Sequence, residues 1–109
     1  MITVTVIPKG EESIYKLMIN KELELRKEKQ GTLHRYGAKG KGKDQWFHTS
    51  YKGWIRFQSC YGGVVVALVR AKNDKDTWQL LTSLIGFLHR HFKENISGIN
   101  LSFGSSAEE

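Results

Sequence analysis

A wide apolar stripe between residues 74 and 94 constrains the fold more than any other feature of this sequence. Its large apolar residues recur at helical spacing and, at about 100° per residue, cover roughly half of a helix cylinder. They are Trp78, Leu80, Leu81, Leu84, Ile85, Phe87, Leu88 and Phe92. Such a stripe is typical of a helix lying across a sheet, and burying all eight side chains would contribute about 1.5–3 kcal/mol each before entropy is subtracted. Asn73 or Asp74 can cap this helix.

The sheet signal is clearest on both sides of a glycine pair. Residues 54–61 and 64–70 flank Gly62-Gly63, which suits a two-residue turn with positive φ angles. This turn predicts that Phe57 faces Leu68. It also predicts a second side on which Trp54, Arg56, Gln58 and Cys60 lie opposite Val65, Ala67 and Val69. Because residues 64–69 are apolar on both faces, we expect a central strand there.

Shorter alternating segments predict the other strands, at residues 2–7, 32–36, 45–51 and 99–103. Residues 14–28 fit a helix through Ile14, Leu17 and Met18, but they also alternate, and we favour a hairpin with a turn at Asn20-Lys21. The expected fold class is α+β. It consists of an antiparallel sheet of five to six strands, with one long helix (about residues 74–94) packed across one face, followed by a final strand. We expect one domain at 1–103 and a flexible C-terminal tail at 104–109.

Composition limits the class of protein. With 39% hydrophobic residues in 109, the chain has enough apolar material for one core. No apolar run reaches the ~18–20 residues of a membrane span, and the first residues do not have the pattern of a secretory signal. The single cysteine, Cys60, excludes an internal disulfide and a zinc site built on several thiolates. We therefore expect a cytoplasmic protein without membrane contact.

The positive charge is concentrated in one segment, residues 29–56. The whole chain has 17 Lys and Arg against 11 Asp and Glu, a net charge of +6. The segment accounts for all of this excess, because its only acid is Asp44, while ten basic and ten acidic residues lie elsewhere. Its seven basic residues are Lys29, Arg35, Lys39, Lys41, Lys43, Lys52 and Arg56. The segment also holds five of the twelve aromatic residues, namely Tyr36, Trp46, Phe47, Tyr51 and Trp54.

Motifs for catalysis, metals or cofactors are weak, and we expect none of the three. Gly37 to Lys43 spells G-x-x-x-x-G-K, but Asp44 follows where a phosphate loop needs Ser or Thr. His89 and His91 point about 200° apart on the helix, and His91 falls within the apolar arc. His34 and His48 could face each other on neighbouring strands, without carboxylates nearby in sequence except Asp44. Cys60 is best explained as a small, semi-buried side chain.

The basic and aromatic residues together predict a non-catalytic module that binds nucleic acid, single-stranded or structured. Cationic side chains neutralise phosphates, and exposed rings stack on unpaired bases. The expected contact residues are Arg35, Tyr36, Lys39, Lys41, Lys43, Tyr51, Lys52, Trp54 and Arg56. Trp46, Phe47 and Trp54 could instead belong to the core.

Two alternatives use the same basic surface or the sheet face that the long helix leaves uncovered, the open sheet face. The first is a protein-interaction module, an inhibitor or adaptor, that binds an acidic protein. The second is a homodimer that covers the open sheet face and buries Trp54, Cys60 and Val65.

Overall fold

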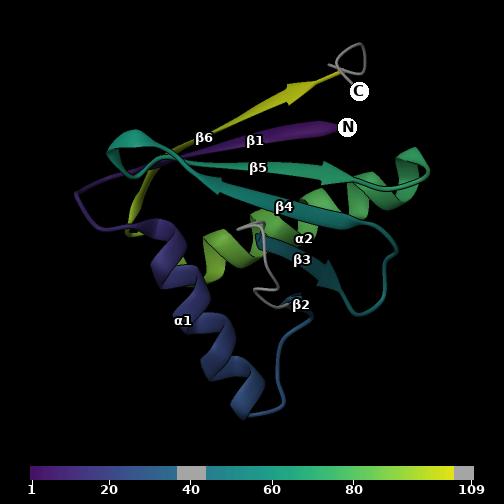
Figure 1. The fold of residues 1–109 in the computed structure, drawn as a ribbon, viewed down its shortest axis with the longest axis horizontal. Coiled ribbons are helices and arrows are strands. Elements are labelled where there is room, and N and C mark those ends of the chain that lie inside the picture. Colours follow the sequence, from purple (N-terminus) through teal and green to yellow (C-terminus); the bar gives the residue numbers. More distant parts are fainter. Residues whose placement is uncertain (37–43, 105–109) are drawn as a thin grey trace.

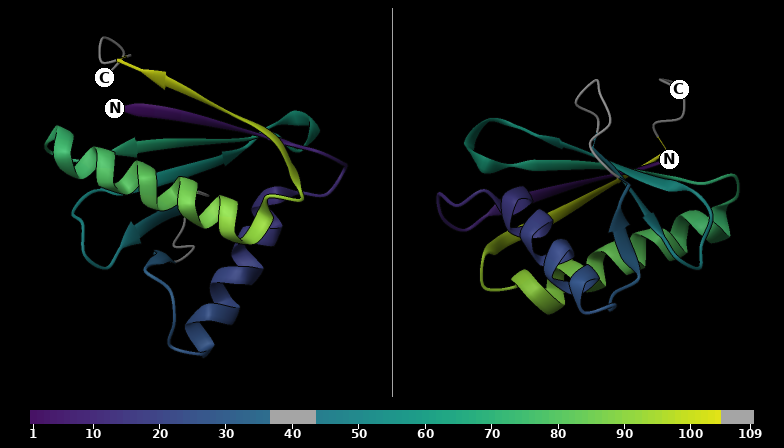
Figure 2. Two further views of the ribbon diagram at one scale, coloured as in Figure 1. Left: turned by 180° about the vertical axis from the view of Figure 1, so that it is seen from behind. Right: turned by 60° about the horizontal axis from the view of Figure 1, so that its bottom comes forward.

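The computed structural model describes residues 1–36 and 44–104 as an antiparallel six-stranded sheet with two helices (Figure 1). The chain order is β1 (Ile2–Pro8), α1 (Ile14–Lys27), β2 (Leu33–Arg35), β3 (Asp44–His48), β4 (Trp54–Ser59), a short 3-10 turn η1 (Tyr61–Gly63), β5 (Val65–Arg70), α2 (Asp74–Phe92) and β6 (Ile96–Phe103). The strand order is β2-β3-β4-β5-β1-β6. The predicted α+β fold class is confirmed, including the long helix across one sheet face and the final strand (Figure 2).

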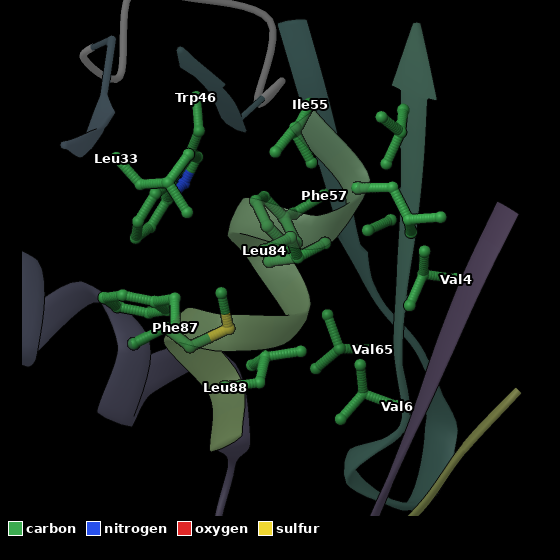
Figure 3. Close-up of a cluster of buried hydrophobic side chains, with 14 of the residues drawn as sticks. Val4, Val6, Leu33, Trp46, Ile55, Phe57, Val65, Leu84, Phe87 and Leu88 are labelled. Carbon is green, nitrogen blue, oxygen red and sulfur yellow. The ribbon is translucent and has the colours of Figure 1, made fainter. Parts of the chain in front are cut away.

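The core lies between α2 and the facing side of the sheet (Figure 3). Val4 and Val6 of β1, Val65 of β5 and Leu84 and Leu88 of α2 are fully or almost fully buried. Asn73 starts α2, because its side-chain oxygen accepts a hydrogen bond of 2.8 Å from the Asp76 backbone N–H. β5 lies between β4 and β1, as its apolar sequence predicts.

The hairpin predicted for residues 14–28 is wrong, because this segment forms α1. Its buried residues Ile14, Tyr15, Met18 and Glu22 follow helical spacing, and the other side of the helix meets solvent. Ser13 caps the helix by accepting from the Lys16 backbone N–H at 3.3 Å. Burying this stripe against the core stabilises the helix more than the weak alternation of the same residues could stabilise a hairpin.

The predicted register between β4 and β5 is wrong by one residue. The loop contains three residues, Tyr61–Gly63, and is closed by a 2.7 Å hydrogen bond from the Cys60 backbone N–H to the Val64 carbonyl. Both glycines have positive φ, 76° and 80°, as a tight turn requires. The actual pairs include Trp54 with Arg70, Arg56 with Leu68 and Gln58 with Val66. Because a one-residue slip changes which side chains share a face, Val65 lies in the core instead of beside Trp54.

Two side chains of the α2 stripe escape full burial, contrary to expectation. Trp78 is 54% exposed and Ile85 is only partly buried. The other six are buried. Trp78, Ile85 and Leu101 of the edge strand β6 line one shallow hollow, so the stripe is wider than the part of the sheet that covers it.

Among the described residues, no helix has the length and apolar character needed to cross a lipid bilayer.

Candidate nucleic-acid interface

The sheet face turned away from α2 is called the open face here. α2 lies on the opposite side, and so does the start of α1, where Tyr15 packs against the core rings of Trp46 and Phe57. Farther along, α1 borders the β2 edge. The strand register places one row of open-face side chains across the sheet. The row consists of Gln45, Arg56, Leu68, Thr3 and Ser102. The open face therefore combines polar, cationic and apolar groups.

Arg56 and Trp54 form the centre of the open face. The Arg56 guanidinium carbon lies 4.4 Å from the centroid of the Trp54 ring, a cation–π contact. Its Nη2 makes one long hydrogen bond, 3.4 Å, to the Gln45 side-chain oxygen. Within residues 1–36 and 44–104, the buried Nε of Arg56 has no hydrogen-bond partner. A buried donor without a partner lowers the stability of the fold by about 1–3 kcal/mol. A ligand acceptor that reaches the Arg56 Nε after a small movement of the side chain would recover part of this free energy.

Two aromatic rings stand beside this centre. Tyr36 is 69% exposed and Phe47 is 36% exposed. Their ring centroids lie 6.2 Å apart in an edge-to-face arrangement, and the His34 ring lies 5.9 Å from Phe47. Tyr36 and Phe47 offer solvent-accessible ring surface on the β2–β3 side of Arg56, whereas the His34 ring is held by the buried Glu22 carboxylate at 3.1 Å.

A cationic hollow lies at the end of the sheet next to Trp54. Its volume is about 390 Å³, and its lining residues are Lys52, Gly53, Trp54, Arg70, Ala71 and Lys72. Gly53 has a φ of 121°, and a Cβ built there would lie 2.5 Å from the Arg70 carbonyl oxygen. Only glycine fits this close approach, which holds Lys52 near Arg70 and Lys72.

Sequence reasoning missed Arg70 and Lys72, because both lie outside the basic segment 29–56. The correct hairpin register would have found Arg70, since it pairs directly with Trp54. The cationic surface is therefore built from two strands and not from one continuous segment.

Other predicted contact residues lie elsewhere. Arg35 pairs with Trp46 across β2 and β3, so it points to the core side, where its Nε donates to Asp44 Oδ1 at 3.1 Å. This hydrogen bond raises the pKa of Arg35. Tyr51 is half-buried against the His48 ring, 4.5 Å away. Lys39, Lys41 and Lys43 lie outside the described residues.

Trp46 belongs entirely to the core. It has no exposed surface, and its Nε1 donates a 3.0 Å hydrogen bond to the Tyr15 hydroxyl. Burial raises the pKa of Tyr15 to about 12, so this hydroxyl remains protonated at neutral pH. The pair joins α1 to β3 beneath the open face and cannot contact a ligand on it.

The histidines and Cys60 also have definite surroundings. His48 faces Leu33 and not His34, and its Nδ1 accepts from the Ser50 backbone N–H at 2.9 Å. Burial lowers the pKa of His48, which favours this neutral acceptor form. Cys60 is exposed, contrary to the semi-buried position expected. In the described ranges, no three His, Cys, Asp or Glu side chains gather closely enough to hold a metal ion.

No protein-family model, curated protein or solved structure matches this chain.

Proposed function

We propose that this protein is a small, non-catalytic, cytoplasmic module that binds nucleic acid on its open face, with a preference for single strands. The observation that carries the proposal is the Arg56–Trp54 stack, which lies between exposed aromatic rings and a cationic hollow. Sheet surfaces with exposed aromatic rings commonly bind unpaired RNA bases, and guanidinium planes also stack on bases. Single-strand sites combine such rings with positive charge.

The groups of the open face divide into two roles. Lys52, Arg70 and Lys72 would contact phosphates at the end of the sheet. Tyr36 and Phe47 would stack on bases, as would the outer side of the Arg56 guanidinium. Lys39, Lys41 and Lys43 stay in the proposal as phosphate contacts on sequence grounds. Stacking needs unpaired bases, so a duplex would engage only the cations.

A titration with a fluorescent, mixed-sequence single strand of about 12 nucleotides, within the length that a small module covers, tests the proposal. We expect modest affinity with little dependence on sequence. If about four phosphates are neutralised, log K should fall with log salt at a slope near roughly −3. Micromolar protein that shows no binding at low salt would contradict the proposal.

Two competitors separate stacking from simple charge attraction. A duplex of the same length should compete more weakly than the unlabelled single strand, because its bases are already stacked. Polyglutamate should compete poorly at equal charge. If polyglutamate competes as well as the single strand, the open face recognises negative charge alone, and an acidic protein becomes the better candidate partner.

A further inference from the structure

The two edges of the sheet differ in how they are covered. At the β2 edge, Arg26 of α1 donates a 3.1 Å hydrogen bond to the Arg35 carbonyl oxygen. Arg26 is itself held by the buried carboxylate of Glu22, at 2.8 and 2.9 Å. At the other edge, no strand of the described chain pairs with the outer side of β6. An uncovered edge strand presents free backbone donors and acceptors to another strand.

β6 is long and uncharged. Its eight residues, Ile96–Phe103, contain no Lys, Arg, Asp, Glu or Pro. Natural edge strands are usually short, charged or interrupted, which prevents pairing with other chains. β6 is neither short nor charged, although the chain as a whole carries a net charge of +6. The register shift in its pairing with β1 lies at residues 96–98, away from Leu101 and Phe103.

An apolar groove runs along the helix side of β6. Three side chains of β6 point to the same side of the sheet as their buried partners on β1. They are Ile99, Leu101 and Phe103, and they are 37%, 37% and 61% exposed. Trp78 of α2, which is 54% exposed, lines the same hollow as Leu101. A hollow of about 470 Å³ lies here, lined by Trp78, Leu81, Thr82, Ile85, Gly86, His89 and Leu101. We call this surface, together with the free edge, the β6–α2 groove.

We infer that the β6–α2 groove is a dimer interface and that its occupant is a second copy of this chain. Antiparallel pairing of β6 with β6 of the copy would satisfy the free backbone groups. A two-fold axis perpendicular to the sheet would relate the two copies, so each copy would present the same surface to the other. Both α2 helices would then lie on one side of the joined sheet, and both open faces on the other.

The lack of charge favours a second copy over a foreign segment. No residue that lines the hollow carries an ammonium, guanidinium or carboxylate group, so two copies bring no like charges together. A charged peptide would find no complementary group in the groove. Self-pairing therefore places a surface without Lys, Arg, Asp or Glu between the copies.

The available area is sufficient for a weak to moderate dimer. The exposed parts of Trp78 and Phe103 amount to roughly 250 Å² of ring surface in each copy. With Ile99, Leu101 and the strand edge added, two copies would bury on the order of 1,000 Å², the lower bound of specific interfaces.

Sedimentation of the full, nuclease-treated chain from about 1 to about 100 μM tests the inference, because a weak to moderate dimer should form within this concentration range. The expected mass rises from 12.5 kDa towards twice that value. Leu101→Lys should raise the dissociation constant at least about 100-fold, because it places two ammonium groups in an apolar interface. Trp78→Gln, on the helix side of the groove, should raise the dissociation constant about tenfold, because it removes apolar surface from the interface.

Leu23→Lys provides the matched control. Leu23 is 44% exposed on α1, outside the groove, so the same kind of substitution there should leave dimerisation unchanged. Circular dichroism confirms that each variant is folded. A wild-type chain that stays monomeric at about 100 μM overturns the inference, as does a folded Leu101→Lys variant that dimerises like the wild type.

Discussion

Replacing Trp46 with alanine should lower the free energy of unfolding by about 3–5 kcal/mol, the usual cost of truncating a buried tryptophan. Trp46 has no exposed surface, and its ring contacts Phe57 and Phe87 at centroid distances of 5.3 and 6.0 Å. The substitution also leaves the buried Tyr15 hydroxyl without its 3.0 Å donor. Small domains have only about 5–15 kcal/mol of total stability, so the variant should be marginally folded.

Urea denaturation followed by circular dichroism measures this loss. Trp46→Phe should have an intermediate effect, because it keeps a ring in the core but removes the indole donor. Tyr61→Ala should have almost none, since Tyr61 is fully exposed in η1. A loss below about 1 kcal/mol for Trp46→Ala would show that this tryptophan is not a central core residue.

Replacing Trp54 with alanine should weaken single-strand binding about tenfold or more, because each stacked base contributes about 1–3 kcal/mol. Trp54 supports the Arg56 guanidinium at 4.4 Å and lines the cationic hollow. Without the indole, Arg56 loses the surface that holds it flat for stacking.

Two further variants separate this role from a general loss of structure. Trp54→Phe keeps an aromatic support for Arg56 and should restore most of the affinity. Tyr61→Ala removes an exposed ring outside the open face and should leave the affinity unchanged. Equal affinity of wild type and a folded Trp54→Ala variant would remove the stack from the proposed site.

Local sequence patterns correctly predicted the elements whose pattern is compatible with one kind of secondary structure. The period of α2 and the two apolar faces of β5 each allow one structure, and both predictions are confirmed. The pattern of residues 14–28 is compatible with two structures, a helix and a hairpin. Which of them forms depends on which side chains become buried against the rest of the core. Met18 and Glu22 decide it, because they are buried four residues apart on one side of α1.

The candidate site was harder to predict because it depends on register. The glycine pair indicated the turn between β4 and β5, but not whether the loop has two or three residues. That one residue determines whether Trp54 lies beside Arg70 and whether Val65 is exposed. Similarly, Trp46 and Phe47 are adjacent aromatics, and only the phase of β3 assigns the first to the core and the second to the open face.

The indole N–H signals of the three tryptophans test the central claim most directly, because each reports on a different part of the molecule. Trp46 lies in the core, Trp54 on the open face and Trp78 in the β6–α2 groove. In a nuclear magnetic resonance titration with a mixed-sequence single strand, the Trp54 signal should shift while the signals of Trp46 and Trp78 stay in place. A shift of Trp78 with Trp54 unmoved would place nucleic acid on the opposite side of the sheet and contradict the proposed function.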